Sequence, residues 1–127
     1  AIMQAFKLPK GTDEEKNARS QAIQDATLYA SEVPLQTAHD AVNVMALALK
    51  VASVGNSNAI TDGASGAAMA RAALTSAGYN VRINLGSLKD RAKAEELLNA
   101  LKRLEAKADE IDESLRSVLN ERGGLTF

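Results

Sequence analysis

Apolar residues recur at intervals of three and four along most of this chain, which is the period of an amphipathic α-helix. The pattern predicts helices at about 12–31, 35–54, 59–85 and 88–121. No segment alternates apolar and polar residues as a half-buried strand does, and no repeat of fixed period is visible. We therefore expect an all-α multi-helix bundle, formed as a single domain by residues 1–127.

Capping and helix-breaking residues set the expected boundaries. Thr12 and Glu15 have the spacing of a capping box at a helix start. Pro34 is expected to end or kink that first long helix and to push Val33 out of the α region. Gly55 follows the second predicted helix, at the C′ position where glycine commonly ends a helix.

The last predicted helix is long and amphipathic, and its apolar residues form a heptad-like seam of about three repeats. The seam consists of Leu97, Leu101, Leu104, Ala108, Ile111, Leu115 and Val118. It fits two interpretations, a coiled coil with a partner chain or an outer helix on the domain's own core. We favour the second, because three heptads are short and the preceding helix needs covering.

That preceding helix is the central element of the expected bundle. Residues 55–85 are mostly Ala, Gly and Ser, with only three charged residues, Asp62, Arg71 and Arg82. Side chains this small let other helices approach on several sides, so the helix is expected to be buried. Its internal glycines are expected to mark close helix contacts: Gly63, Gly66 and Gly78.

Composition supports helices and narrows the function. Hydrophobic residues make up 46% of the chain and aromatic residues 3%, which favours packed helices over a β-sandwich. A formal net charge of −1 offers no global field for nucleic acid or an anionic membrane, and we expect neither as a partner. The chain has no cysteine, which excludes disulfides and thiolate metal sites and is compatible with a reducing cytoplasm, the expected location.

His39 is the only histidine, and no second histidine or cysteine completes a metal site of the usual kind, so none is expected.

Asp62 is the first candidate for chemistry, because a lone carboxylate near the start of a buried helix is costly unless it is paired or used. We expect it in a concave, partly shielded site; the alternative is that it only stabilises the helix dipole. Asn58 lies one turn before Asp62, Asn80 five turns after it, and Asn84 one turn further. Asp62 and Asn80 are then about 27 Å apart, too far for one reacting atom in one subunit. They line two ends of a long cleft or sites at a dimer interface.

A second candidate is the basic cluster around the first breaker, Pro9. Its members are Lys7, Lys10, Lys16 and Arg19. They form either a solvated surface or a small anion site.

Several short motifs occur in a fixed order. They are Lys7-Leu8-Pro9-Lys10, Thr12-x-x-Glu15, Val33-Pro34-Leu35, Gly55-Asn56, Thr61-Asp62 and Asn80-Val81-x-Ile83-Asn84-Leu85. In order and spacing they resemble the C-terminal domain family of formiminotransferase-cyclodeaminase, which includes bacterial methenyltetrahydrofolate cyclohydrolases. The resemblance covers about residues 1–88, and the rest matches only as a generic long helix. The family often has Ser-Asp where this chain has Thr61-Asp62.

The resemblance implies an all-helical domain that forms a homodimer or higher homo-oligomer, with a folate site near the dimer interface. It implies cyclodeamination of 5-formiminotetrahydrofolate or hydrolysis of 5,10-methenyltetrahydrofolate, with tetrahydrofolate as the substrate carrier and no metal. Asp62 is then the catalytic candidate. Lys10 is the candidate for a glutamate carboxylate, and Asn58, Asn80 and Asn84 are the other substrate-binding candidates.

Family members begin with further helices, including a Gly-rich segment, so the resemblance also implies that an upstream segment is missing and that the domain is N-terminally incomplete. Ile2, Met3 and Phe6 fit the last turns of a helix already under way. The rival interpretation is a non-catalytic helical module that dimerises through the seam at 97–118. A third is a family member that binds folate without turnover.

Overall fold

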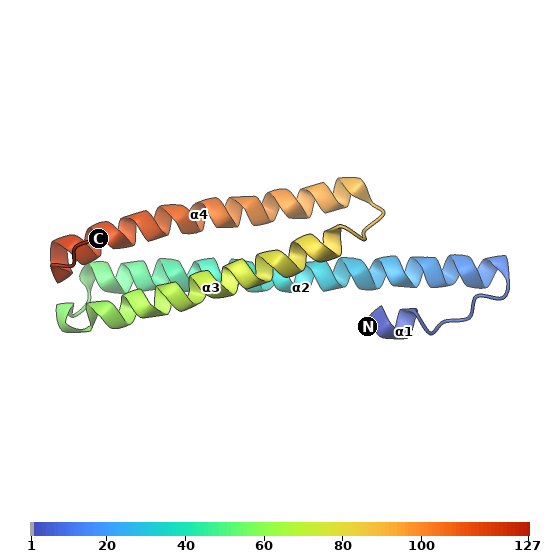
Figure 1. Cartoon of the computed structure of the whole chain (residues 1–127), viewed down its shortest axis with the longest axis horizontal. Helices are drawn as coiled ribbons and strands as arrows, with labels where there is room; N and C mark the ends of the chain where they lie inside the picture. Colours follow the sequence, from blue (N-terminus) through green and yellow to red (C-terminus); the bar gives the residue numbers. More distant parts are fainter. Residues whose placement is uncertain (1) are drawn as a thin grey trace.

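The computed structural model describes residues 2–127, and in this range the chain is all-α, as predicted. Its elements are α1 (Ile2–Ala5), α2 (Asp13–Val54), the 3₁₀ turn η1 (Ser57–Ala59), α3 (Ile60–Leu85) and α4 (Arg91–Gly123). Figure 1 shows α2, α3 and α4 running side by side as a long, narrow bundle, with α1 folded back on the start of α2. No helix in the described range has the length and apolarity needed to cross a bilayer.

The start of α2 confirms the predicted capping box. The Glu15 backbone N–H donates to Thr12 Oγ1 at 3.2 Å, and the Thr12 backbone N–H donates to Glu15 Oε2 at 3.1 Å. Glu15 Oε2 also accepts from the Gly11 N–H at 2.7 Å. These contacts satisfy donors that a helix start otherwise leaves free.

The prediction that Pro34 ends the first long helix is wrong, because α2 runs as one element from Asp13 to Val54 with Pro34 inside it. The prediction that Val33 leaves the α region is wrong for the same reason. Proline removes one N–H from the helix, so the carbonyl four residues earlier, that of Ala30, loses its usual partner. Asn84 supplies a replacement, since its Nδ2 donates to the Ala30 carbonyl at 2.7 Å. A side chain of α3 thus allows α2 to continue.

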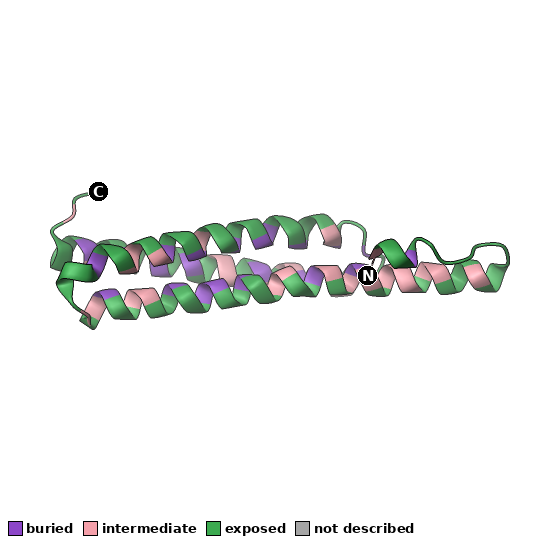
Figure 2. Ribbon diagram, turned by 90° about the horizontal axis from the view of Figure 1, so that it is seen from below, coloured by how far each residue is buried: buried purple, intermediate pink, exposed green. Residues whose placement is uncertain are grey.

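The Ala-rich helix α3 is buried on one side only, which corrects the expectation of a fully buried helix. Ala67, Leu74 and Val81 are almost inaccessible, while Met69 and Ile83 are 76% and 73% exposed. Figure 2 shows the same division along the bundle, with buried residues turned toward neighbouring helices. Within one chain, α3 therefore keeps an uncovered outer face.

The glycines of α3 differ in their surroundings. A Cβ on Gly78 would lie 3.7 Å from the Leu101 side chain and 3.2 Å from that of Glu105, so α4 approaches closely there, as predicted. A Cβ on Gly66 would meet nothing within 4 Å, so the predicted contact is absent among the described residues. Gly63 is intermediate, with the Ala48 carbonyl 3.7 Å from the added carbon.

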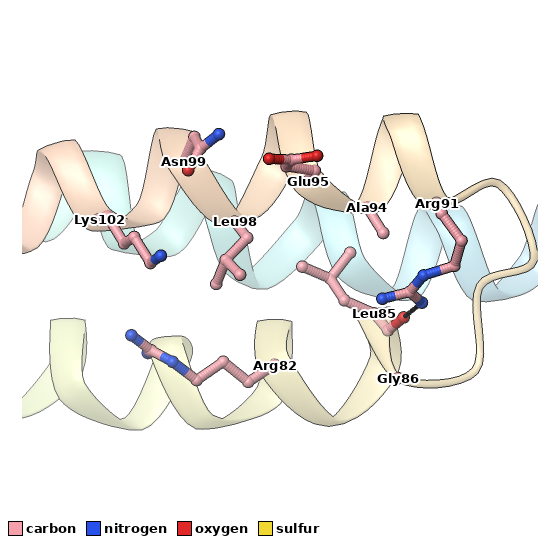
Figure 3. A pocket seen from close by; sticks show the side chains of 9 residues that line it. All are labelled: Arg82, Leu85, Gly86, Arg91, Ala94, Glu95, Leu98, Asn99 and Lys102. Atoms are coloured by element: carbon pink, nitrogen blue, oxygen red, sulfur yellow. Dashed lines mark hydrogen bonds between the residues drawn. The ribbon is translucent and has the colours of Figure 1, made fainter.

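Two arginines of α4 tie its ends to the other helices. Arg91 Nη1 donates to the carbonyls of Leu85 and Leu88, at 3.0 and 3.1 Å, where α3 ends (Figure 3). Arg122 donates to the carbonyls of Ala52 and Gly55, where α2 ends. Both cations meet the carbonyl-rich ends of helices, where positive charge is favourable.

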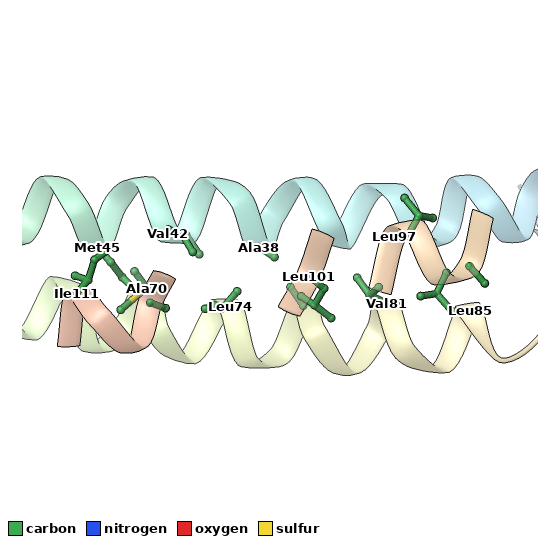
Figure 4. Close-up of a cluster of buried hydrophobic side chains, with 14 of the residues drawn as sticks. Ala38, Val42, Met45, Ala70, Leu74, Val81, Leu85, Leu97, Leu101 and Ile111 are labelled. Carbon is green, nitrogen blue, oxygen red and sulfur yellow. The ribbon is translucent and has the colours of Figure 1, made fainter. Parts of the chain in front are cut away.

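The apolar seam of α4 packs into the chain's own core, as the favoured interpretation predicts. Leu101 and Ala108 are fully buried, and Leu97 and Ile111 nearly so. Figure 4 shows Leu97, Leu101 and Ile111 among side chains of α2 and α3. Because these residues are buried against α2 and α3 of the same chain, they are not available as an apolar seam for a second copy.

Candidate functional site

A groove between α2 and α3 gathers two of the residues predicted to bind substrate. It consists of two adjoining hollows, of about 430 and 280 Å³, that share Pro34, Thr37 and Asn80. Asn84 and Ala30 line the larger hollow, and we call the pair of hollows the Pro34 groove. The remaining lining residues are Ile2, Ala26, Tyr29, Val33, Ala73, Ser76 and Ala77.

Asn84 is held in the groove by the carbonyl that Pro34 leaves without a partner. A carbonyl oxygen only accepts hydrogen bonds, so the Asn84 nitrogen must be the atom that faces Ala30. This contact joins residues 54 positions apart and is partly buried. It fixes the orientation of the Asn84 side-chain amide, so the Oδ1 atom points away from the Ala30 carbonyl.

Asn80 and Thr37 are also anchored to main-chain carbonyls. Asn80 Nδ2 donates to the Ser76 carbonyl at 3.0 Å, and Thr37 Oγ1 donates to the Val33 carbonyl at 3.3 Å. Each contact spans one helical turn. The groove's polar side chains are therefore oriented by the helices that carry them.

The rest of the groove is apolar and partly open. Tyr29 and Val33 on α2 are 61% and 48% exposed, although both are large hydrophobic residues. None of the residues that line the two hollows is charged. The groove thus combines an apolar wall with a few oriented polar atoms, the usual character of a small-molecule site.

Asp62 lies far from this groove in the single chain. It is the third residue of α3, about 27 Å along the helix from Asn80 at 1.5 Å per residue. It is exposed, contrary to the expectation of a shielded site, and it makes no hydrogen bond or ion pair with any residue in the described range. Its catalytic role therefore stays a prediction.

Asn58 and Lys10 lie outside the groove as well. Asn58 is exposed in η1, where its backbone N–H donates to Asn56 Oδ1 at 3.0 Å. Lys10 is exposed in the loop between α1 and α2, at the opposite end of the bundle from Asp62 (Figure 1). The chain therefore brings Asn80 and Asn84 together but does not bring Asn58, Asp62 or Lys10 to them.

The basic cluster predicted around Pro9 is divided among separate contacts. Lys16 pairs with Asp13 at 2.9 Å. Arg19 donates to the Phe6 carbonyl at 3.2 Å and lies over the Phe6 ring. Arg19 thus ties the end of α1 to α2, whereas Lys16 pairs within the first turn of α2, so Lys7 and Lys10 are the cluster's remaining cations.

Another hollow, of about 610 Å³, lies between the end of α3 and the start of α4 and contains none of the predicted site residues. Figure 3 shows Arg82, Arg91 and Lys102 around an apolar floor that includes Leu85 and Leu98. Arg91 is bound to main-chain carbonyls, and both Nη atoms of Arg82 donate to Glu105 at 2.8 Å. The hydrogen bond from Arg82 lowers the pKa of Glu105. The two arginines hold helices together, so we take the Pro34 groove as the candidate site.

Sequence reasoning missed the α2 side of the groove. Thr37 and Tyr29 were not predicted to be site residues. Pro34 was predicted to break the helix and belongs to the Val33-Pro34-Leu35 motif, but it was not predicted to shape a site. A sufficient signal was present, since a proline inside a helical pattern frees a carbonyl that must find another donor.

Among the described residues, no three His, Cys, Asp or Glu side chains gather into a group able to hold a metal.

Known proteins resemble this chain over most of its length. A family model described as formiminotransferase-cyclodeaminase matches residues 1–103. A methenyltetrahydrofolate cyclohydrolase of Methylorubrum extorquens is 44% identical over 115 residues, which cover 91% of this chain and 55% of that protein. Formimidoyltransferase-cyclodeaminases of Gallus gallus and Mus musculus are 38% and 32% identical over 90 residues, which cover 71% of this chain and 17% of each of those proteins. The chain spans about half the length of the Methylorubrum relative and a smaller share of the others.

Proposed function

Because the chain belongs to the formiminotransferase-cyclodeaminase family, we propose that it acts on a one-carbon unit carried by tetrahydrofolate. The reaction is either cyclodeamination of 5-formiminotetrahydrofolate or hydrolysis of 5,10-methenyltetrahydrofolate. The observation that carries the proposal is the Pro34 groove, which lies within the family-matched residues and holds Asn80 and Asn84 against an apolar wall. The names of the relatives support both reactions.

Both reactions need a proton donor or acceptor near the one-carbon unit. In cyclodeamination N10 attacks the formimino carbon, the bond from that carbon to the imino nitrogen breaks, and the nitrogen leaves as ammonia. In hydrolysis water adds to the methenyl carbon, and the ring then opens to a formyl group. We assign Asp62 the proton transfer and Lys10 a carboxylate of the folate tail. Asn58 is assigned a polar contact to substrate beside Asp62.

The distance between Asp62 and Asn80 requires two chains for one site. Both residues lie on the outer side of α3 and are exposed. Suppose that two copies pack α3 against α3 in antiparallel fashion, with the two-fold axis at the level of residue 71 along the helix. Asp62 of one copy then lies opposite Asn80 of the other. The outer residues near that axis are small or flexible, namely Ser65, Met69, Ala72, Ala73 and Ser76, which suits close approach.

Complementation between two variants tests the shared site. Asp62→Asn is expected to reduce turnover of one of the two folates at least about 100-fold, the lower end of what a positioned acid–base group contributes. Asn80→Leu is expected to reduce it about 10-fold, the value of one hydrogen bond. When the variants are mixed and allowed to exchange subunits, one of the two sites in each hybrid dimer is intact. The mixture then recovers about a quarter of wild-type activity, as two-fold symmetry requires.

Each outcome of this assay has a clear meaning. Mixing without recovery rejects a site that Asp62 of one copy shares with Asn80 of the other. Absence of turnover of either folate by the wild-type protein rejects the enzymatic proposal and favours the non-catalytic interpretation. An assay of both substrates in parallel separates the deaminase from the hydrolase.

A further inference from the structure

Three polar side chains of the Pro34 groove share one property: each directs a donor at a main-chain carbonyl. Thr37 uses its hydroxyl proton on Val33, Asn80 uses an amide N–H on Ser76, and Asn84 uses an amide N–H on Ala30. The distances are 3.3, 3.0 and 2.7 Å. These contacts to main-chain carbonyls therefore determine which atoms of the three side chains remain available to a ligand.

Lone pairs outnumber the donors that these three side chains still offer, although each asparagine amide keeps one N–H besides its oxygen. Asn80 Oδ1, Asn84 Oδ1 and the Thr37 oxygen accept no hydrogen bond from any residue in the described range. An amide oxygen has two lone pairs, and a hydroxyl that donates can still accept. Among the described residues no charged side chain lines the groove, so these residues offer nothing that would neutralise a carboxylate or a phosphate.

We propose that the Pro34 groove binds the pterin ring of the folate by the edge that carries its N–H groups, and not the glutamate tail. This proposal rests on the proposed function. A tetrahydropterin presents an exocyclic amino group and ring N–H groups along one side of a largely flat ring. Those donors match the three acceptor oxygens, while the ring face fits the apolar wall at Tyr29 and Val33.

Pro34 gives the groove its shape, and Asn84 is a positioning residue within it. Without Pro34, the Ala30 carbonyl would bond within α2 and the Asn84 amide would be free to turn. With Pro34 in place, the amide is held and its Oδ1 atom stays fixed at the groove. Asn80 makes its contact within α3 and does not join the two helices. It is therefore the better position at which to test whether the ligand donates to a side-chain oxygen.

Titration calorimetry with two fragments tests the proposal. A tetrahydropterin fragment carries the N–H edge, whereas p-aminobenzoyl-glutamate carries the tail and no pterin. Asn80→Leu is expected to weaken binding of the pterin fragment about 10-fold, the value of one hydrogen bond of ordinary strength. Asn80→Asp keeps oxygen acceptors and is expected to retain binding within about 3-fold. Binding of p-aminobenzoyl-glutamate is expected to be unchanged by both variants and weakened by Lys10→Ala.

Asn99→Leu, at an exposed position of α4, is the matched control and leaves both affinities unchanged. Far-ultraviolet circular dichroism and thermal unfolding establish that each variant is folded. Equal losses for Asn80→Asp and Asn80→Leu would show that the amide N–H of Asn80, and not its oxygen, carries the affinity, and would overturn the proposal. So would absence of pterin binding by the wild-type protein, or binding that Asn80→Leu leaves intact.

These outcomes are distinct from failure of the proposed function. Turnover of a complete folate together with a pterin affinity that is insensitive to Asn80 overturns the groove assignment alone. Pterin binding that depends on Asn80, with no turnover of either folate, supports the groove assignment and rejects the enzyme.

Discussion

At the scale of single residues, Pro34 and Asn84 form a coupled pair although they are fifty positions apart. We expect Asn84→Ala to lower the free energy of unfolding by about 1 kcal/mol, because the partly buried Ala30 carbonyl is left without a donor. In a Pro34→Ala background the restored backbone N–H supplies that donor, so Asn84→Ala should cost close to nothing. A double-mutant cycle by urea denaturation measures the coupling. Additive effects of the two substitutions would contradict it.

Arg82 and Glu105 give a prediction for pH. The hydrogen bond from Arg82 lowers the pKa of Glu105 in the folded chain, so this pair stabilises the fold above the ordinary glutamate pKa of about 4.3. The contribution is lost as the pH falls through the lowered value. The two side chains are 42% and 29% exposed, so the effect at pH 7 is modest, about 0.5 kcal/mol.

Urea unfolding of wild type and Glu105→Gln at several pH values tests this pair. The two proteins should differ at pH 7 and converge as the pH falls from the ordinary glutamate pKa through the lowered one. A difference that is independent of pH would assign the loss to packing instead of charge.

How much a residue's role can be predicted from sequence depends on where its partner lies. The capping box of Thr12 and Glu15 was predictable because both partners lie within one turn. The contact between Asn84 and Ala30 was not, because it depends on how two helices align. Asp62 was expected to be shielded on the assumption that its helix is buried all round, and in the single chain that helix is open on Asp62's side.

At the scale of helices, the period of apolar residues predicted the number and type of elements but not which sides are covered. The pattern of α4 gave its buried side correctly, since a continuous apolar seam beside charged residues leaves one choice. The pattern of α3 gave no side, because small residues occur all around it. Pro34 was misjudged because the compensating donor comes from another helix.

The burial of the α4 seam predicts a specific loss of stability. Leu101→Ala should lower the free energy of unfolding by about 2–5 kcal/mol, because Leu101 is fully buried and its removal leaves a cavity. Leu47→Ala on α2 is the matched control, since Leu47 is 63% exposed, and should cost less than about 0.5 kcal/mol in the monomer. Similar losses at both positions, measured at concentrations where the protein is monomeric, would contradict the packing of α4.

At the scale of the whole molecule, large exposed apolar side chains are distributed unevenly over the three long helices. Those on α2 and α3 are Tyr29, Val33, Val44, Leu47, Val51, Val54, Met69, Tyr79 and Ile83. Within its described range, α4 contributes none. Patches of this kind mark interaction sites, so we expect a partner on the α2 and α3 side and solvent on the α4 side.

We expect the chain to self-associate through α3 in solution. Burial of a few hundred Å² of apolar surface contributes several kcal/mol at about 25 cal/mol per Å², enough to favour a dimer over an exposed monomer. We expect Ile83→Glu to dissociate the wild-type oligomer without unfolding it, because Ile83 is 73% exposed in one chain and a buried carboxylate at the contact is costly. Ala106→Glu, at an exposed position of α4, should leave the oligomer intact. Sedimentation velocity at micromolar concentration, with circular dichroism as the check on folding, distinguishes the two. A monomeric wild-type chain, or dissociation by Ala106→Glu but not by Ile83→Glu, would place the contact elsewhere and remove the basis for a site shared between two copies.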